Sequence, residues 1–358
     1  MYAPEKQKPD AEAPCAMHNC SHLCVPVQKP NGFIAQCLCR DEYTLSTDGT
    51  CKPTPTSKGA MYVYALVDRI CAMPIKKLMK KNLKEIPDSF CFFNHSSKGY
   101  KFRAVDFNYR EGEIYFSEFG TSVKTIRRAR LEKKSVNSVL VYGTGDVRGL
   151  VVDWMTSNMY WTDATAGAIW VSRLGGQYMR KIVTDISNPG AVALDMQTKR
   201  LLWTESRDNQ SRIMVAKLDG SQPSTFVSVT INGSNSTFTS LTVDYVEERI
   251  YWVDPSGNSI WSASLIDGSG QKKQDLVTRP GKIYGVTVMQ DFVGFTESST
   301  SGSSIHVAEK DSGRELRPRG ITHDSRHAAY DIVAYYRGNQ PLLLGTIFIF
   351  KTWLNSFS

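Results

Sequence analysis

Cysteines are the residues of this sequence whose type and spacing most directly predict chemistry. Six of the eight lie in one stretch, CAMHNCSHLCVPVQKPNGFIAQCLCRDEYTLSTDGTC, which runs from Cys15 to Cys51. A segment of under about 40 residues buries too little apolar surface to fold alone, so this density of cysteines predicts disulfides or a bound metal. The CLC triplet argues against zinc, because ligands of one tetrahedral site usually follow C-x2-C spacing. Six cysteines allow fifteen pairings, and spacing alone does not choose among them.

The other two cysteines, Cys71 and Cys91, bracket the basic run KKLMKKNLK at 76–84. An even remainder in an oxidising compartment predicts that they pair, and two free buried thiols are the alternative. Such cysteine usage predicts an extracellular or cell-surface ectodomain. We expect neither a signal peptide in MYAPEKQKPD nor a membrane span in PLLLGTIFIF, since a span needs about 20 apolar residues. Four sequons agree with that compartment and give candidate glycosylation sites: Asn94, Asn209, Asn232 and Asn235.

Catalytic and nucleic-acid-binding signatures are missing from the 358 residues. The sequence has no H-E-x-x-H, G-x-S-x-G or P-loop motif and no His/Asp cluster with metal-ligand spacing. A formal net charge of +8 is basic, but the basic run carries no interleaved aromatics or nucleic-acid motif. We therefore predict a protein that is not an enzyme, holds no cofactor or metal, and does not bind nucleic acid.

A four-residue pattern recurs along the chain. It reads YFSE at 115, YWTD at 160, LWTE at 202, YWVD at 251 and GFTE at 294, with a weaker copy, YVYA, at 62. Seven residues before a tetrad, an apolar run ends in Asn or Asp, as in LVVD and VALD, and an isoleucine follows each tetrad at a similar distance. Four short antiparallel strands in a repeat of about 40–50 residues are the signature of a propeller blade. Six tetrads predict six blades.

The tetrad residues are predicted to be scaffold. In a strand, Tyr160 and Thr162 point to one face and Trp161 and Asp163 to the other. Blades are packed on both faces, where aromatic rings fill the wedge-shaped gaps, and buried polar groups must find partners. We therefore expect the tetrads to hold the ring together and not to contact a ligand.

These repeats resemble the YWTD, or LDL-receptor class B, propeller of the low-density-lipoprotein receptor-related family, over residues 59 to 341. The resemblance implies an all-β, six-bladed YWTD propeller whose ring closes by pairing MYVYALVDR near the N-terminus with AAYDIVAYY near the C-terminus. Two positions depart from the family pattern: Gly294 replaces an aromatic, and Asn108 stands where Asp is usual.

The cysteine-rich head resembles the EGF-like modules of the same family, through CSHLC and LSTDGTC. The resemblance implies the bridges Cys15–Cys24, Cys20–Cys37 and Cys39–Cys51. The residues before Cys15 lack the Asp-x-Asx-Glu arrangement of calcium-binding modules, so we expect no calcium there. The whole chain is then divided into a disordered tail at 1–13, an EGF-like module at 14–52, a linker at 53–58, a propeller at 59–341 with an insertion at 71–91, and an atypical C-terminal tail at 342–358.

The residues just before each innermost strand are the candidates for ligand contact, because exposed residues on a rigid frame usually carry recognition. They form a basic, aromatic set: Arg103, Arg148, Thr239, Tyr284 and Tyr330. Arg and Tyr are enriched at binding hot spots, and this set holds no carboxylate that could bind a cation.

The family resemblance implies a receptor ectodomain that takes part in endocytosis, binds extracellular protein ligands and releases them in acid. Release in acid calls for groups that titrate between pH 5 and 8, and His306, His323 and His327 are the candidates. Protonated, they could compete for the acidic ligand-binding repeats that such receptors carry elsewhere. A matrix-adhesion or structural spacer module of a secreted glycoprotein is the alternative.

Overall fold

The structure is a computed structural model. It describes residues 23–29, 32–38, 43–46, 50–53, 60–74, 91–94, 101–121, 124–131, 135–230, 238–254, 256, 259–273, 281–300, 302–315, 321–323 and 329–340. The chain divides into two compact units, Met1–Lys58 and Gly59–Ser358.

The first unit contains two antiparallel hairpins. Their strands are β1 (Leu23–Lys29) with β2 (Gly32–Leu38), and β3 (Tyr43–Leu45) with β4 (Cys51–Pro53). Cys37 in β2 is disulfide-bonded. The side chains of Cys15, Cys20, Cys24, Cys39 and Cys51 lie outside the described set, so the EGF-like pairing of this unit stays a prediction.

The second unit is built from six four-stranded antiparallel sheets, the blades of a propeller. Blade 1 comprises β8 (Lys101–Asn108), β9 (Glu113–Phe119), β10 (Lys124–Arg130) and β11 (Ser135–Tyr142). Blade 2 comprises β12 (Val147–Asp153), β13 (Asn158–Asp163), β14 (Ala168–Arg173) and β15 (Arg180–Val183). Blade 3 comprises β16 (Val192–Asp195), β17 (Arg200–Arg207), β18 (Gln210–Lys217) and β19 (Ser224–Thr230).

The remaining blades follow the same order, except that blade 6 draws on both ends of the unit. Blade 4 comprises β20 (Leu241–Asp244), β21 (Arg249–Val253), β22 (Ile260–Ser264) and β23 (Lys272–Lys273). Blade 5 comprises β24 (Lys282–Met289), β25 (Phe292–Ser299), β26 (Gly302–Glu309) and β27 (Ile321–His323). Blade 6 comprises β28 (Ala329–Tyr335), β5 (Met61–Leu66), β6 (Arg69–Pro74) and β7 (Cys91–Asn94).

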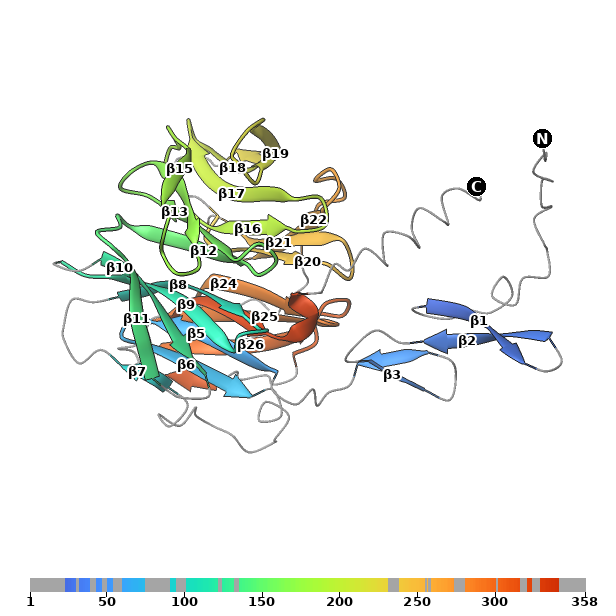
Figure 1. The fold of residues 1–358 in the computed structure, drawn as a ribbon. Helices are drawn as coiled ribbons and strands as arrows, with labels where there is room; N and C mark the ends of the chain where they lie inside the picture. The colour runs from blue at the N-terminus through green and yellow to red at the C-terminus, as the bar shows by residue number, and fades with distance from the viewer. Residues whose placement is uncertain are drawn as a thin grey trace. The chain divides into compact units, whose positions relative to one another are not determined.

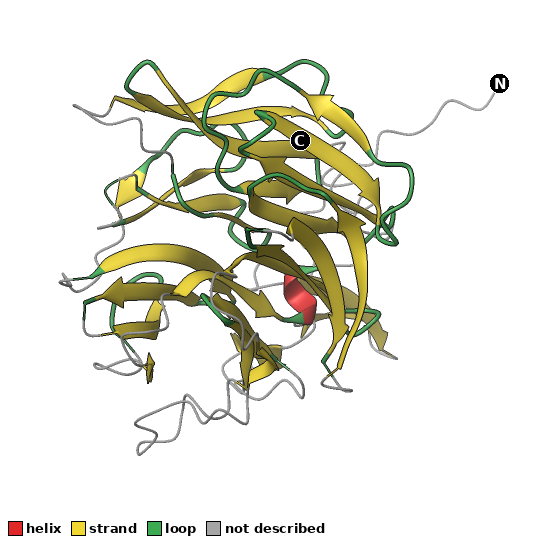
Figure 2. Cartoon of the chain, turned by 90° about the vertical axis from the view of Figure 1, so that its left-hand side faces the viewer, coloured by secondary structure: helices red, strands yellow, loops and turns green. Residues whose placement is uncertain are grey.

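The first strand of each blade in these lists is its innermost strand, and the six innermost strands contact one another in a closed ring. Figure 1 labels β8, β12, β16, β20 and β24 among them. The ring closes where β28 pairs with β5, with Ile332 opposite Tyr64 and Ala334 opposite Tyr62. The six blades confirm the prediction from the repeats, and this seam confirms the closure that the family resemblance implied. We call the face on which the innermost strands begin the start face, and the opposite one the end face. Within the described residues the helical structure is one 3-10 turn, η2 (Arg337–Asn339), coloured red in Figure 2.

The tetrads are buried, as predicted for scaffold. Trp161, Trp203 and Trp252 are at most 1% exposed, so each fills the space between two neighbouring blades. The third tetrad residue ties blades together. Thr162 accepts a hydrogen bond from Gly149 N in its own blade at 2.9 Å and donates one to Gly190 O of the next.

Other blades repeat this bridge with a different hydroxyl. Thr204 accepts from Ala191 N at 2.8 Å and donates to Phe238 O at 3.0 Å, ahead of blade 4. Ser117 accepts from Ala104 N at 3.1 Å and donates to Val147 O at 3.3 Å. In blades 1 to 3 the third tetrad residue thus joins consecutive blades, a contact that an apolar residue such as Val253 of blade 4 cannot make.

The Asp that ends an innermost strand caps the turn that follows. Asp153 Oδ1 accepts hydrogen bonds from Met155 N at 3.0 Å and Thr156 N at 2.9 Å. Asp195 and Asp244 make the same pair of contacts in blades 3 and 4. Such Asx turns explain why these carboxylates recur in an otherwise apolar strand.

A disulfide joins Cys71 and Cys91, the pairing expected from the sequence. The two residues lie opposite each other in the pairing of β6 with β7. The bridge therefore spans the outer half of blade 6 and brackets the segment predicted as an insertion.

Candidate functional site

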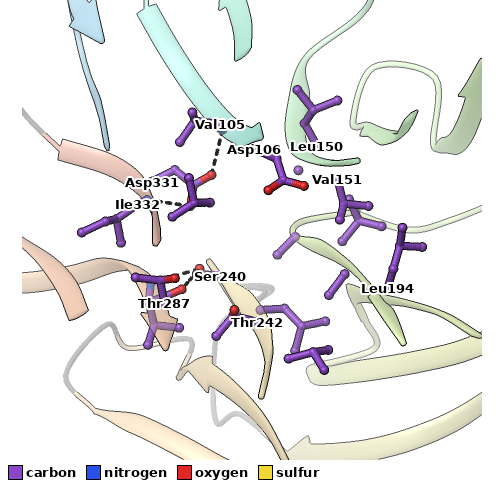
Figure 3. Close-up of a pocket in the computed structure, with 18 of the residues that line it drawn as sticks. Val105, Asp106, Leu150, Val151, Leu194, Ser240, Thr242, Thr287, Asp331 and Ile332 are labelled. Carbon is purple, nitrogen blue, oxygen red and sulfur yellow. Dashed lines mark hydrogen bonds between the residues drawn. The ribbon is translucent and has the colours of Figure 1, made fainter. Parts of the chain in front are cut away.

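A cavity of about 110 Å³ lies on the propeller axis. All six innermost strands contribute to its wall, which Figure 3 shows from within. Because the six innermost strands surround the cavity, residues from opposite sides of the ring face one another across it. Four of the five candidate ligand residues line it: Arg103, Arg148, Thr239 and Tyr330.

The fifth candidate, Tyr284, joins this group through Tyr330. The two tyrosine rings meet edge to face, with centroids 6.0 Å apart and planes at 77°. The structure thus brings all five residues together around the start-face mouth of the cavity. Both tyrosines keep part of their surface exposed, and Thr239 is exposed.

The mouth is less basic than the sequence predicts, because Asp146 lies between its two arginines. Arg103 Nη1 is 2.6 Å from Asp146 Oδ1, and Arg148 Nε is 3.0 Å from Asp146 Oδ2. The five candidate residues themselves include no carboxylate, and Asp146 adds one to the mouth. Asp146 precedes β12 by one residue, and only the ring geometry brings it to Arg103 of the neighbouring blade.

Contacts across the blades hold the two guanidinium groups in place. Arg148 Nη1 donates to Asn188 Oδ1 at 2.5 Å, and Asn188 Nδ2 donates to Ser206 Oγ at 2.8 Å. The Arg103 guanidinium lies over the Phe119 ring, 4.9 Å from its centroid. The arginine side chains remain 26% and 34% exposed. Each can thus present its free N–H donors to a ligand while its own position is set by the protein.

Two further carboxylates, Asp106 and Asp331, point into the cavity (Figure 3). Asp331 Oδ2 accepts a hydrogen bond from Val105 N of blade 1 at 3.0 Å. Asp106 Oδ2 accepts one from Val152 N of blade 2 at 2.6 Å. Asp331 therefore joins the innermost strands of blades 6 and 1, and Asp106 joins those of blades 1 and 2.

Burial raises the pKa of both carboxyls. The pKa of Asp106 is raised from 3.8 to about 7, mainly by desolvation, and the charge of Asp331 adds to the shift. Desolvation raises the pKa of Asp331 to about 7 as well. The hydrogen bonds from backbone N–H groups act in the opposite direction and are outweighed. Sequence analysis missed this pair, although an acidic residue inside the apolar runs AVDFN and AAYDIVAYY is a visible signal.

The end-face side of the cavity is formed by Trp154, Tyr245, Asn339 and Gln340. Gln340 accepts a hydrogen bond from Tyr109 N at 2.9 Å and donates one to Phe107 O. Tyr245 donates to Leu194 O at 2.6 Å and meets Trp154 edge to face. These side chains are engaged with the propeller itself, so the start face presents the more available polar groups. Among the described residues, no group of three or more His, Cys, Asp and Glu could hold a metal ion.

His306, the candidate histidine whose side chain the structure describes, does not line the cavity. His306 lies in β26 of blade 5, where its side chain is 1% exposed and stacks on Phe295 with centroids 5.0 Å apart. Its Nε2 is 3.0 Å from Glu297 Oε2, and its Nδ1 is 3.8 Å from Glu315 Oε2. His306 therefore cannot touch a ligand directly. The side chains of His323 and His327 lie outside the described residues.

One candidate glycosylation site can be placed. Asn209 lies between β17 and β18 and is exposed, with φ 59°. The side chains of Asn94, Asn232 and Asn235 lie outside the described set, so all four sites stay predictions.

Known proteins are similar to part of this chain. The chain is 28% identical over 195 residues to a vitellogenin receptor of Solenopsis invicta, covering 54% of this chain and 10% of that protein. It is 25% identical over 242 residues to the vitellogenin receptor Yl of Drosophila melanogaster, covering 67% of this chain and 11% of that protein. These likenesses support the resemblance to the YWTD-propeller, or LDL-receptor class B, family.

A third relative is the protein cueball of Drosophila yakuba, 26% identical over 214 residues, which cover 57% of this chain and 32% of the relative. The chain thus spans about a tenth to a third of the length of these curated relatives. No family model matches the chain. As a relative of receptors, this YWTD propeller is a non-catalytic module, in agreement with the sequence prediction.

Solved structures share the fold at low sequence identity. A nidogen/laminin complex includes a chain that matches with a TM-score of 0.64 and 16% identity, covering 78% of this chain and 99% of that one. TolB of Acinetobacter baumannii matches with a TM-score of 0.55 and 12% identity, covering 78% of this chain and 68% of that one. These likenesses support the propeller fold of the YWTD unit. Among the helices of the described residues, none is both long and apolar enough to cross a membrane.

Proposed function

We propose that this YWTD propeller is an extracellular protein-binding module in the ectodomain of an endocytic, lipoprotein-receptor-related receptor, and that it binds protein ligands at the start-face mouth. The observation that carries this proposal is the convergence of partly exposed Arg and Tyr side chains on one rigid ring. Arg103 and Arg148 are oriented by Asp146, and Tyr284 and Tyr330 supply apolar area beside them. Two of the relatives are named vitellogenin receptors, which supports the receptor assignment.

The mouth fits a ligand that brings hydrogen-bond acceptors to the axis. The guanidinium groups have donors left after binding Asp146, and a carboxylate or amide oxygen would accept from them. Because the arginines are held by the protein, little side-chain freedom is lost on binding. Acidic ligand-binding repeats of a parent receptor have this chemistry, as do acidic loops of other extracellular proteins.

Release in acid belongs to the same proposal, with His306, His323 and His327 as the titrating groups. A proton on His306 would place a charged imidazolium against Glu297 and Glu315. Since His306 is buried, it can act only by changing the packing of blade 5, not by repelling the ligand itself.

Surface plasmon resonance on the full chain tests the ligand site. The probes are laminin, which is complexed with nidogen in a structure of the same fold, and calcium-loaded cysteine-rich repeats of a lipoprotein receptor. We expect at least one probe to bind, and Arg148→Ala and Arg103→Ala each to weaken it by about tenfold, equivalent to about 1.4 kcal/mol. Arg314→Ala, which removes an exposed arginine from the end-face turn after β26, is the matched control. Equal binding by all three variants would contradict the proposed site.

The same assay at about pH 7.4 and about pH 5.5 tests release. We expect weaker binding in acid for the wild type and no such difference for the combined variant His306→Gln, His323→Gln, His327→Gln. Binding of laminin alone, without pH dependence, would favour the matrix-adhesion alternative. Wild-type binding that does not change with pH removes acid release from the proposal and leaves the binding site untouched.

A further inference from the structure

A second cavity, of about 260 Å³, lies away from the axis, at the end face between blades 2 and 3. Most of its wall is one face of blade 2, because the residues concerned are cross-strand partners in β13, β14 and β15. These residues are Asn158, Tyr160, Val171, Arg173 and Arg180. Ser172 in β14, Tyr178 in the turn between β14 and β15, and Leu218 of blade 3 also line it.

This space is open because blade 2 has a short side chain where blades 3 and 4 have an arginine. Asn158 stands two residues before its tetrad, and Arg200 and Arg249 stand at the same place in blades 3 and 4. Arg200 reaches the turn between β22 and β23, donating to Leu265 O at 2.5 Å and to Ile266 O at 3.3 Å. Arg249 contacts this turn from within its own blade, donating to Gly270 O at 2.9 Å, so Arg200 is the residue that fills the space between two blades. An asparagine is too short for such a contact, so the equivalent space in blade 2 remains empty.

Two arginines converge on this space with donors to spare. Arg173 Nη1 donates to Thr156 O at 2.8 Å and lies 3.4 Å from Asn158 Oδ1, which leaves its other N–H groups free for a ligand. Within the described part of the chain, the exposed Arg180 side chain has no ion-pair or hydrogen-bond partner. Burial is the main cause that raises the pKa of the Tyr160 hydroxyl, at the base of the cavity, to about 12. The positive charge of Arg180 acts in the opposite direction and lowers this pKa. The nearby Asp219 carboxylate is engaged with Ser221, through N at 2.9 Å and Oγ at 2.6 Å.

An apolar rim flanks the arginines. Tyr178 is 87% exposed and Met179 is 46% exposed, both in the turn that borders the cavity. Tyrosine, methionine and arginine are the residue types enriched where proteins bind proteins. A sulfated polysaccharide would meet the charges but would gain little from the apolar rim, so the composition favours a protein partner.

We propose that this cavity binds an acidic side chain of a protein partner, with its carboxylate between Arg173 and Arg180 and an adjoining apolar side chain against Tyr178 and Met179. The site is on the opposite face from the start-face mouth and shares no residue with it. A ligand held at the mouth and a partner held here could therefore be bound at the same time.

Isothermal titration of the full chain tests this site. The probe is an acetylated and amidated pentapeptide with one glutamate between two leucines, and its twin has glutamine in place of glutamate. We expect the glutamate peptide to bind about tenfold more tightly than the glutamine twin, because a carboxylate accepts charge-assisted hydrogen bonds from both arginines. Arg180→Ala should remove that preference, and Tyr178→Ala should weaken both peptides.

Asn158→Arg is the decisive variant, because it gives blade 2 the side chain that blades 3 and 4 already have. We expect it to abolish binding of the glutamate peptide while the melting temperature is retained, since blade 3 accommodates Arg200 opposite Lys217. Arg148→Ala, at the start-face mouth, should leave this binding unchanged, which separates the two sites. Equal affinity for the two peptides, or full binding by Asn158→Arg, would overturn the proposal. So would binding of a heparin oligosaccharide that is lost in Arg180→Ala while neither peptide binds.

Discussion

The ring of Tyr62 occupies the space of the side chain that Gly294 lacks. A Cβ atom at Gly294 would lie 2.7 Å from Cε1 of Tyr62 and 3.2 Å from Cγ2 of Thr287. Gly294 opens the tetrad of blade 5, where the other blades have Tyr or Leu, and Tyr62 comes from the neighbouring blade 6. The Tyr62 ring thus fills both its own place in blade 6 and the space that a side chain at position 294 would occupy. This explains why GFTE departs from the common pattern.

Gly294→Ala should therefore destabilise the propeller by about 1–3 kcal/mol, the usual cost of overpacking a dense core. Chemical denaturation of the purified chain measures the free energy of unfolding. In a Tyr62→Leu background the smaller side chain leaves room, and the same substitution should cost clearly less. An equal cost in both backgrounds would show that the contact with Tyr62 is not the cause.

The tetrad hydroxyls give a second prediction about stability. Thr162→Val keeps the shape of the side chain but leaves Gly149 N and Gly190 O, both buried between blades 2 and 3, without this partner. We expect a loss of about 1–3 kcal/mol in the free energy of unfolding. Thr184→Val removes a hydroxyl that donates to Asp185 at the surface and should change stability by no more than about 0.5 kcal/mol. If the two valine variants unfold alike, the bridge between the blades contributes nothing.

Periodicity in the sequence was sufficient to predict the blades, because a repeat of tetrads and apolar runs records local strand structure, whereas the seam was implied by the family resemblance. It did not predict which charges meet at the axis. Asp331 and Val105 are hydrogen-bonded across the ring closure, yet they are far apart in the chain. The ion pair between Asp146 and Arg103 likewise joins residues of neighbouring blades that are distant in the sequence. Such contacts depend on how neighbouring blades are rotated, which strand patterns do not encode. The cavity between blades 2 and 3 is different, since comparing Asn158 with Arg200 and Arg249 would have indicated it.

A third prediction concerns the contribution of the buried Lys310–Asp244 ion pair to stability. The Lys310 side chain is 3% exposed, and its Nζ contacts the carboxylate of the buried Asp244 and lies 3.1 Å from Glu247 Oε1. Lys310→Met should cost about 3–5 kcal/mol, because it leaves the Asp244 carboxylate buried without its cation. Arg314→Ala breaks a pair with Glu309 at the surface and should leave the melting temperature unchanged. Equal melting temperatures for wild type and Lys310→Met would show that Asp244 is adequately compensated by its backbone hydrogen bonds.

The last prediction concerns pH and follows from Asp106 and Asp331. Their pKa values in the folded chain, about 7, lie above the ordinary value of 3.8, so the folded state holds these protons more tightly than the unfolded state does. Their contribution to stability is therefore fully present below about pH 4 and is lost as the pH rises through about 7. Mild acidification should stabilise the folded ring, because it removes charge that is costly in the cavity, and this gain outweighs the weaker hydrogen bonds that neutral carboxyls accept. We expect the wild type to gain stability relative to the double variant Asp106→Asn, Asp331→Asn when the pH falls from about 8 to about 5, as measured by thermal unfolding across that range.

The amides keep an oxygen that can accept from Val152 N and Val105 N but do not titrate, so the variant is a matched control for hydrogen bonding. If the difference between the two proteins does not change with pH, or changes in the opposite direction, the carboxyls are not proton-binding groups of this ring. The result also bears on acid release, since these two carboxyls stabilise the folded ring in acid, and release would then depend on other titrating groups.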